Sequence, residues 1–327
     1  MTLPAITSPR PIVIANRFSI GLLGLAGLLF VAVLIYGGYL LTVMQLAMIY
    51  GIFCLGLNFF MGYTGQASFG QNAFACIGGY GSAILSVQYN WEPGLALLAS
   101  MAVAGVAALL IGYPTLRLRG HYLAMATFAL GLITYDITVQ WTSLTQGYMG
   151  YAGIPPLGVG SFTVEDERMK LICLGLLLLF AFWISQRLRD SRFGRGLRAI
   201  AGSEDGASAL GIRISRFKLI AFVIAALYAS AAGSLFAHTV GFISPEVFGP
   251  QMVIVTFTML YVGGVGTMIG PVIGAIVASL LPELFRSTGR FQDIAYALVL
   301  LVMLIYAPKG LSALGSLFRP RADKDEV

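Results

Sequence analysis

The sequence consists largely of long apolar segments that are almost free of charge. An α-helix needs roughly 20 apolar residues to cross the hydrocarbon of a bilayer, and about ten segments approach that length. They are 18–38, 40–61, 67–88, 94–113, 122–140, 170–187, 217–238, 251–265, 269–285 and 292–307. Only 10% of all residues are charged and 58% are hydrophobic, whereas soluble domains carry about 25% charged residues. The sequence therefore predicts an all-α polytopic membrane protein with about ten transmembrane helices.

The connections between these segments leave no room for a separate soluble domain. We expect one transmembrane domain over 18–307, preceded by a cytoplasmic segment 1–17 and followed by a cytoplasmic tail 308–327. The first span follows Arg10 and Arg17. It is longer than a signal-peptide core and has no clear cleavage site, so we expect it to be retained.

The distribution of Lys and Arg predicts which loops face the cytoplasm, because cytoplasmic loops carry an excess of both. The segment 186–217 is strongly basic, and 113–122 holds Arg117 and Arg119 without an acid. Both segments should be cytoplasmic. By contrast, 141–170 carries an acidic cluster and few basic residues, so it should face outside.

A second glycine-rich stretch leaves the organisation of 250–285 open. The region contains GGVGTMIGP at 263–271 and could form one long span or two helices broken at these glycines. Two helices give ten spans with both chain ends in the cytoplasm, which violates the positive-inside rule less than one span does. Breaks of this kind also occur in re-entrant segments, so the predicted fold includes Gly-rich broken or re-entrant helices.

The residues expected of an enzyme or an ion-coupled carrier do not form a pattern here. Cys54, Cys76 and Cys173 lie in apolar stretches without metal-ligand spacing, and no nucleophile has a base near it in sequence, so we predict no catalytic and no metal-binding residues. Ion-coupled carriers keep ionisable groups inside the bundle, yet only Asp136 lies well inside a span. No phosphate-binding G-x-x-x-x-G-K-[ST] motif occurs, and no basic face of a soluble fold indicates a nucleic-acid partner. Uphill transport would need energy from another subunit.

Polar residues interrupt the apolar pattern at the start of the third segment. The stretch 62–85 reads GYTGQASFGQNAFACIGGYGSAIL. Polar side chains are costly in hydrocarbon unless they face protein or water, and the N-terminus of a broken helix favours anionic groups such as a carboxylate. Together with the break at 263–271, this pattern indicates a transport path near the middle of the membrane. A cytoplasmic turn between two ordinary helices explains it equally well.

The basic loop contains a second signal, a short helix that Ser203 can cap. Acidic residues suit the first turn of such a helix, and Gly211 suits its end. The helix is too short to be stable alone in water, where about 12–15 residues are needed. It fits a docking element that the bundle presents to a partner, and it fits equally a solvated loop whose arginines only fix the topology.

Two stretches resemble a known family. The runs GLNFFMGYTGQASFGQNAFACIGGY (56–80) and RFGRGLRAIAGSEDGASALGIRISRFKLIAFVIAALYASAAGSLFA (192–237) are similar to the permease subunits of branched-chain amino acid ABC importers, and most similar to the LivM-type subunit. The stretches 261–275 and 145–156 match the family as well. The resemblance covers most of 45–310. Gln146 departs from it, where a Gly-Gly pair is commoner, and so does the uncharged run before Glu204.

The resemblance implies an ABC importer permease fold in a bacterial inner membrane. It implies a LivH-type permease as the second half of the core, two P-loop ATPase subunits that bind ATP and Mg, and a periplasmic solute-binding protein. The chain itself would hold no cofactor and would contact the lipid bilayer. Branched-chain amino acids would be the cargo, with urea or short amides as an alternative. Composition alone leaves a passive channel or secondary carrier for small neutral solutes as the rival.

The resemblance also assigns roles to particular residues. The residues that would couple the permease to the ATPase are Ser203, Glu204, Asp205, Gly206, Ala207, Leu210 and Gly211. The stretch 62–81 would lie at or beside the translocation path, where polar contacts would come from Asn58, Gln66, Ser68, Gln71 and Asn72.

Overall fold

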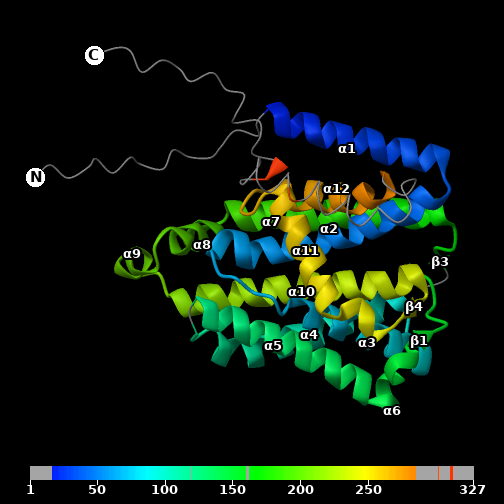
Figure 1. Cartoon of the computed structure of the whole chain (residues 1–327), viewed down its shortest axis with the longest axis horizontal. Helices are drawn as coiled ribbons and strands as arrows, with labels where there is room; N and C mark the ends of the chain where they lie inside the picture. The colour runs from blue at the N-terminus through cyan, green and yellow to red at the C-terminus, as the bar shows by residue number, and fades with distance from the viewer. Residues whose placement is uncertain (1–16, 119, 160–161, 285–300, 302–309, 312–327) are drawn as a thin grey trace, which may run out of the picture.

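Long helices that run roughly along one common direction form most of the molecule (Figure 1). The computed structural model describes residues 17–118, 120–159, 162–284, 301, 310 and 311. The long helices are α1 (Arg17–Tyr36), α2 (Tyr39–Thr64), α3 (Gln71–Gln88), α4 (Pro93–Thr115), α5 (His121–Gln140), α7 (Glu167–Asp190), α10 (Ile214–Val240), α11 (Pro250–Gly263) and α12 (Gly270–Leu284).

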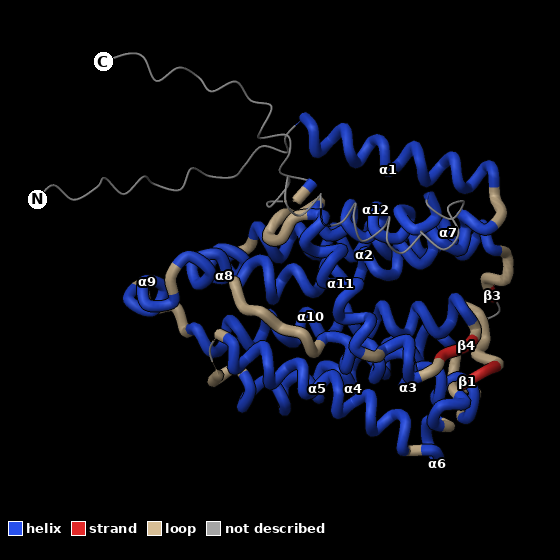
Figure 2. The backbone as a smooth tube through the Cα atoms, in the orientation of Figure 1, coloured by secondary structure: helices blue, strands red, loops and turns tan. Residues whose placement is uncertain are grey.

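The short elements gather at the two ends of this bundle. At one end, which we call the α9 end, lie α8 (Arg192–Gly202) and α9 (Glu204–Ala209). The opposite end, which we call the strand end, carries the small strands (Figure 2). Its elements are α6 (Thr142–Thr145), η1 (Gly147–Met149), β1 (Tyr151–Ala152), β2 (Gly158–Val159), β3 (Phe162–Thr163), β4 (Phe242–Ile243) and η2 (Pro245–Phe248). Strand β1 pairs antiparallel with β4, and β2 with β3.

Burial shows which helices lie at the centre. The apolar window of α2 is 78% buried and that of α10 is 56% buried, whereas those of α4, α5 and α7 are each 28% buried. The outer helices turn large apolar side chains outward, among them Leu98, Met125 and Leu176. An apolar outer surface is what a lipid environment requires, and the chain is a multi-pass membrane protein.

The expected count of about ten spans remains a prediction. Among the described residues, five helices are long and apolar enough to cross a membrane, namely α2, α4, α5, α7 and α10. Three shorter apolar helices accompany them, at Gly24–Tyr36, Pro250–Gly263 and Gly270–Glu283. The predicted span 292–307, most of the segment 1–17 and most of the tail 308–327 lie outside the described residues, as does Arg119.

Small residues bring α10 against α3. A stripe of small residues on α10, formed by Ala225, Ala229, Gly233 and Ala237, is buried throughout. A Cβ on Gly233 would lie 2.0 Å from the carbonyl oxygen of Ala75 on α3, so the two backbones touch directly. Close backbone approach through small residues is how helices associate in lipid.

The region 250–285 forms two helices rather than one. Helix α11 contains 14 residues, so it is roughly 21 Å long and shorter than the hydrocarbon thickness of about 30 Å; the described part of α12 contains 15 residues. Gly264 and Gly266 turn the chain between them with positive φ angles of 115° and 76°. The helices then pack back on each other, because a Cβ on Gly274 would lie 1.8 Å from the carbonyl oxygen of Met259.

The third predicted span, 67–88, begins later than the sequence indicates. Helix α2 ends at Thr64, where Gly65 adopts the left-handed conformation with φ 69° and ψ 15°. Residues 65–70 are not helical and run from the end of α2 back into the bundle, as the tan tube in Figure 2 shows. Helix α3 therefore begins at Gln71.

Candidate functional site

The short helix expected in the basic loop is present as α9. The Ser203 hydroxyl accepts a 3.1 Å hydrogen bond from the backbone N–H of Gly206, which is the N-cap interaction that the sequence indicated. At the other end Gly211 has a positive φ of 80° and turns the chain toward α10. Local sequence therefore specifies both ends of α9.

Helix α8 attaches α9 to the bundle. Its inner face is buried through Gly194, Gly196, Leu197 and Ile200, and its opposite face carries exposed arginines. The ring of Phe193 stacks on Phe217 of α10 with centroids 5.4 Å apart. A rigid helix thus holds α9 at the outermost point of this end of the molecule (Figure 1).

Most of α9 and its C-terminal flank is exposed. Leu210 is 81% exposed although it is apolar, and Asp205 and Gly206 are exposed as well. From Ser203 to Gly211 only Ala207 is fully buried, with 2% exposure, and Glu204 is partly buried. Two of the predicted coupling residues therefore face the bundle at least in part, Ala207 and Glu204, and the others form a free surface.

Glu204 connects α9 to two other parts of the chain. Its Oε1 accepts a 2.7 Å hydrogen bond from the ammonium of Lys218 at the start of α10, forming an ion pair. The same oxygen accepts a 3.0 Å hydrogen bond from the side-chain amide of Gln66. The side chain of Lys218 is only 3% exposed and that of Glu204 is 24% exposed. The buried ammonium therefore needs this carboxylate as its counter-charge, whereas the carboxylate can also be solvated by water.

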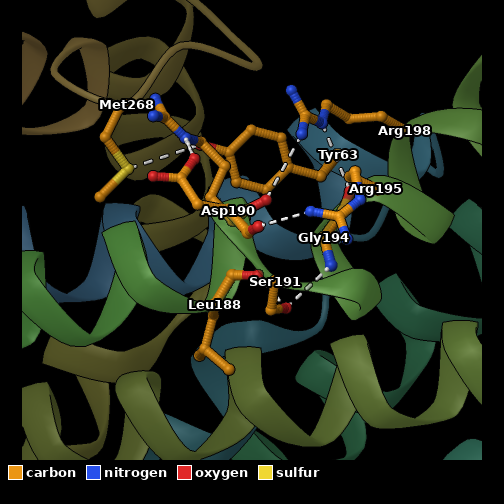
Figure 3. Close-up of polar contacts among 9 residues, drawn as sticks. Tyr63, Leu188, Asp190, Ser191, Gly194, Arg195, Arg198 and Met268 are labelled. Carbon is orange, nitrogen blue, oxygen red and sulfur yellow. Dashed lines mark hydrogen bonds and ion pairs between the residues drawn. The ribbon is translucent and has the colours of Figure 1, made fainter.

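The base of α8 meets the end of α2 and the α11–α12 connection, and Figure 3 shows this junction. The Tyr63 hydroxyl donates to the sulfur of Met268 at 3.6 Å. Ser191 caps α8 by accepting from the N–H of Gly194 at 3.3 Å, and Arg195 donates to the carbonyl oxygen of Asp190 at 2.8 Å. These bonds attach α8 to the end of α7 and attach α2 to the α11–α12 connection, and Figure 3 shows the two groups next to each other.

The segment 65–70 leads from Glu204 toward a small buried cavity. The N–H of Phe69 donates to the hydroxyl of Thr127 on α5 at 3.1 Å. Gly70 lies so close to α5 that a Cβ would come within 2.3 Å of the Thr127 carbonyl oxygen. These contacts hold the segment in place beyond Gln66, the residue that binds Glu204.

The cavity lies between α2, the start of α3 and α11. Its volume is about 10 Å³, and its lining residues are Phe53, Leu57, Ser68, Phe69, Gln71, Asn72, Val253, Thr256 and Phe257. Four polar side-chain atoms there are buried without a hydrogen-bond partner among the described residues, namely Ser68 Oγ, Gln71 Nε2, Gln71 Oε1 and Asn72 Oδ1. Buried polar groups are normally paired, so this cluster is unusual for a packed bundle.

Similarity to known proteins identifies the class of molecule that carries these features. A family model described as the permease component of the branched-chain amino acid transport system matches residues 39–307. The chain belongs to this permease family. Its relatives are permease subunits of ABC transporters, and the protein is a transport subunit rather than an enzyme.

Individual relatives of the permease agree with this assignment. It is 31% identical over 289 residues to LivM, the high-affinity branched-chain amino acid transport permease of Escherichia coli K12, covering 81% of this chain and 68% of LivM. It is 27% identical over 297 residues to LivH of the same strain, covering 84% of this chain and 93% of LivH. LsrC, an autoinducer 2 import permease of Escherichia coli O9:H4, is 29% identical over 63% of this chain and 69% of its own length.

Among solved structures, PsaBC from Streptococcus pneumoniae in complex with Fab matches 86% of the permease and 96% of its own chain. The TM-score is 0.43 and the sequence identity is 15%.

The structure separates the five residues that the sequence placed on a translocation path. Ser68, Gln71 and Asn72 line the cavity, whereas Gln66 binds Glu204. Asn58 instead holds the α11–α12 connection. Its Nδ2 donates to the carbonyl oxygen of Thr267, and its Oδ1 accepts from the N–H of Gly266, both at 2.8 Å.

Sequence reasoning missed the role of Lys218. Lys218 directly follows the basic segment 186–217, whose basic residues are all arginines, and no role beyond the topology was expected of it. The available signal was the position of Lys218 in the first turns of an apolar helix, where a buried ammonium needs an anion. Glu204, which lies 14 positions before Lys218, supplies that anion.

Proposed function

We propose that this permease forms half of the translocation path of an ATP-driven importer in the bacterial inner membrane, with branched-chain amino acids as cargo. The names of LivM and LivH support the cargo class. A LivH-type permease would form the second half of the core, and a periplasmic solute-binding protein would deliver the amino acid. ATP and Mg would be bound by two separate P-loop ATPase subunits, since energy for uphill transport has to come from outside this chain.

The observation that carries the proposal is the hydrogen bond between Glu204 and Gln66. Glu204 belongs to the exposed helix α9, and Gln66 belongs to the segment that leads to the buried polar cavity. This one hydrogen bond thus joins α9, which is suited to docking on an ATPase, to the segment 65–70, which is suited to lining a translocation path. A loop that served only to fix the topology would have no need of such a link.

Helix α9 has the properties of a docking element. It is six residues long, too short to persist in water without support, and α8 supplies that support. The exposed apolar residue Leu210, which directly follows α9, would fill a groove on the ATPase, with Ser203, Asp205, Gly206 and Gly211 around it. Closure of the ATPase pair on ATP would push α9, and the push would shift the permease between its inward- and outward-open forms through the differential affinity of ATP for the two states.

The proposal places the α9 end in the cytoplasm. Exposed arginines cluster there, at Arg192, Arg195, Arg198, Arg213 and Arg216, and cytoplasmic loops are rich in such residues. The loop 186–217, the segment 1–17 and the tail 308–327 would then be cytoplasmic, and the strand end would face the solute-binding protein.

Gentle solubilisation from the native membrane tests the proposal. The tagged chain should copurify with a P-loop ATPase pair and one homologous permease in stoichiometric amounts. A Leu210→Glu variant, which changes the exposed tip of α9, should lose the ATPase and retain the homologous permease. A lone chain or a homo-oligomer without ATPase would overturn the proposal and would favour a passive channel or secondary carrier.

A further inference from the structure

We propose that the cavity at the start of α3 is a binding subsite for the α-amino and α-carboxylate groups of an amino acid with a neutral side chain as it crosses the permease. This inference rests on the proposed function and deepens it, because it names the side chains that would contact the cargo. Ser68 and Gln71 would supply hydrogen bonds to the amino and carboxylate groups, and the apolar wall of the cavity would contact the aliphatic side chain.

The unpartnered polar atoms are the first support. Gln71 is 3% exposed and Ser68 is 1% exposed, and neither side chain has a hydrogen-bond partner among the described residues. A buried polar group left unpaired destabilises a fold. Two neighbouring side chains in this helical bundle have buried polar atoms without a hydrogen-bond partner among the described residues. We take this as an indication that they bind a partner that is present only during transport.

The N-terminus of α3 is the second support. Helix α3 has 18 residues, and no side chain caps it at Gly70. The first N–H groups of a helix have no partner within the helix, and the dipole there favours an anion. A carboxylate at this position would be met by backbone N–H groups and by the Gln71 side chain together.

The wall opposite these groups suits an aliphatic side chain. Phe53 and Leu57 come from α2, and Val253 and Phe257 come from α11. None of the lining residues is ionisable. A cargo with a charged side chain would therefore find no counter-charge, and its burial there would be costly. The subsite thus favours neutral side chains over charged ones.

The cavity is too small for an amino acid in this conformation. Its volume of about 10 Å³ is close to the space that one water molecule needs. Phe69 and Phe257 both line it, and their ring centroids lie 5.1 Å apart. To admit an amino acid, α11 has to move away from the segment 65–70, and that segment is the one held by Glu204 through Gln66.

A pair of measurements on Gln71→Leu tests the inference. In proteoliposomes that hold the complete importer, uptake of radiolabelled leucine at limiting concentration should fall about tenfold, the factor that a loss of roughly 1.4 kcal/mol produces. The melting temperature of the purified complex should stay the same or rise, because the substitution removes two polar atoms that have no partner. A residue needed only for packing would instead lose stability together with uptake.

Two further variants complete the test. Ser68→Ala, which removes a single unpartnered oxygen, should lower uptake in the same direction, and it makes a smaller change to the fold. Ser230→Ala is the matched control, since Ser230 Oγ is also buried without a partner but does not line the cavity, and its uptake should equal that of the wild type. Wild-type uptake by both Gln71→Leu and Ser68→Ala would overturn the inference.

The same vesicles separate failure of this inference from failure of the proposed function. If Gly206→Arg on α9 abolishes uptake while the cavity variants transport leucine normally, only the subsite is wrong. If the wild-type complex shows no ATP-dependent uptake at all, the proposed function is wrong and the subsite falls with it.

Discussion

The side-chain amide of Gln66 donates a 3.0 Å hydrogen bond to Oε1 of Glu204, across 138 positions of sequence. Lys218 donates to the same oxygen at 2.7 Å. The exposed helix α9, the segment 65–70 and the start of α10 therefore meet at one carboxylate. A displacement of α9 would therefore also move the segment 65–70, which leads to the cavity.

The unequal burial of Glu204 and Lys218 predicts unequal effects on stability. Glu204→Gln leaves a buried ammonium without its anion and should lower the free energy of unfolding by about 1–3 kcal/mol. Lys218→Met leaves a carboxylate that is 24% exposed and can reach water, so its cost should be at most about 1 kcal/mol. Thermal denaturation in detergent measures both. The double variant should be more stable than Glu204→Gln, and the reverse order would refute the assignment.

Gly206→Arg should leave the permease folded but uncoupled. A Cβ at Gly206 meets only Ser203, at 3.4 Å, so the arginine has room to point outward where the ATPase would dock. Uptake should disappear while ATP hydrolysis by the complex persists. Ser215→Arg adds the same charge at an exposed position of the same end but off α9, and it should transport normally. Normal uptake by Gly206→Arg would disprove a coupling role for α9.

Asn58→Leu should act on stability rather than on recognition of cargo. The substitution removes two hydrogen bonds of 2.8 Å to the α11–α12 connection and should lower the free energy of unfolding by about 2 kcal/mol. Thr258→Val, which removes an exposed hydroxyl that bonds only within α11, should change stability little. If Asn58→Leu left the melting temperature unchanged but impaired uptake, Asn58 would instead act on the translocation path.

Gly233→Ala should weaken the contact between α10 and α3. The added methyl would lie 2.0 Å from the Ala75 carbonyl oxygen, so the helices have to separate, at a cost of about 1–3 kcal/mol. Gly24→Ala in α1 is the control, because no atom of the described residues lies within 4 Å of its Cβ position. Equal melting temperatures for the two variants would contradict the close packing.

Much of the fold could be predicted because apolar segments and helix caps are local signals. The capped helix at 203–211 and the break at 263–271 follow from Ser203, Gly211 and the glycines themselves. Family resemblance then supplied the class of protein.

The remaining features depend on contacts between distant segments, which spacing does not encode. Nothing local separates Asn58, which binds a connection 208 positions away, from Gln71, which faces a cavity. The start of α3 was misplaced because Ala67, Ser68 and Phe69 fit a helix in isolation, whereas in the structure the segment 65–70 is not helical and Gly70 packs closely against α5. The pairing of Lys218 with Glu204 is different, because these residues lie only 14 positions apart and the place of the lysine in an apolar helix indicated that it needs an anion.

The most direct test of the central claim is the ratio of leucine transported to ATP hydrolysed, measured in one preparation of proteoliposomes with Gln66→Leu. If the bond to Glu204 carries the movement of α9 to the segment 65–70, hydrolysis should continue and the ratio should fall well below that of the wild type. Gln140→Leu, at an exposed position near the strand end, should keep the wild-type ratio. An unchanged ratio in Gln66→Leu would contradict the account.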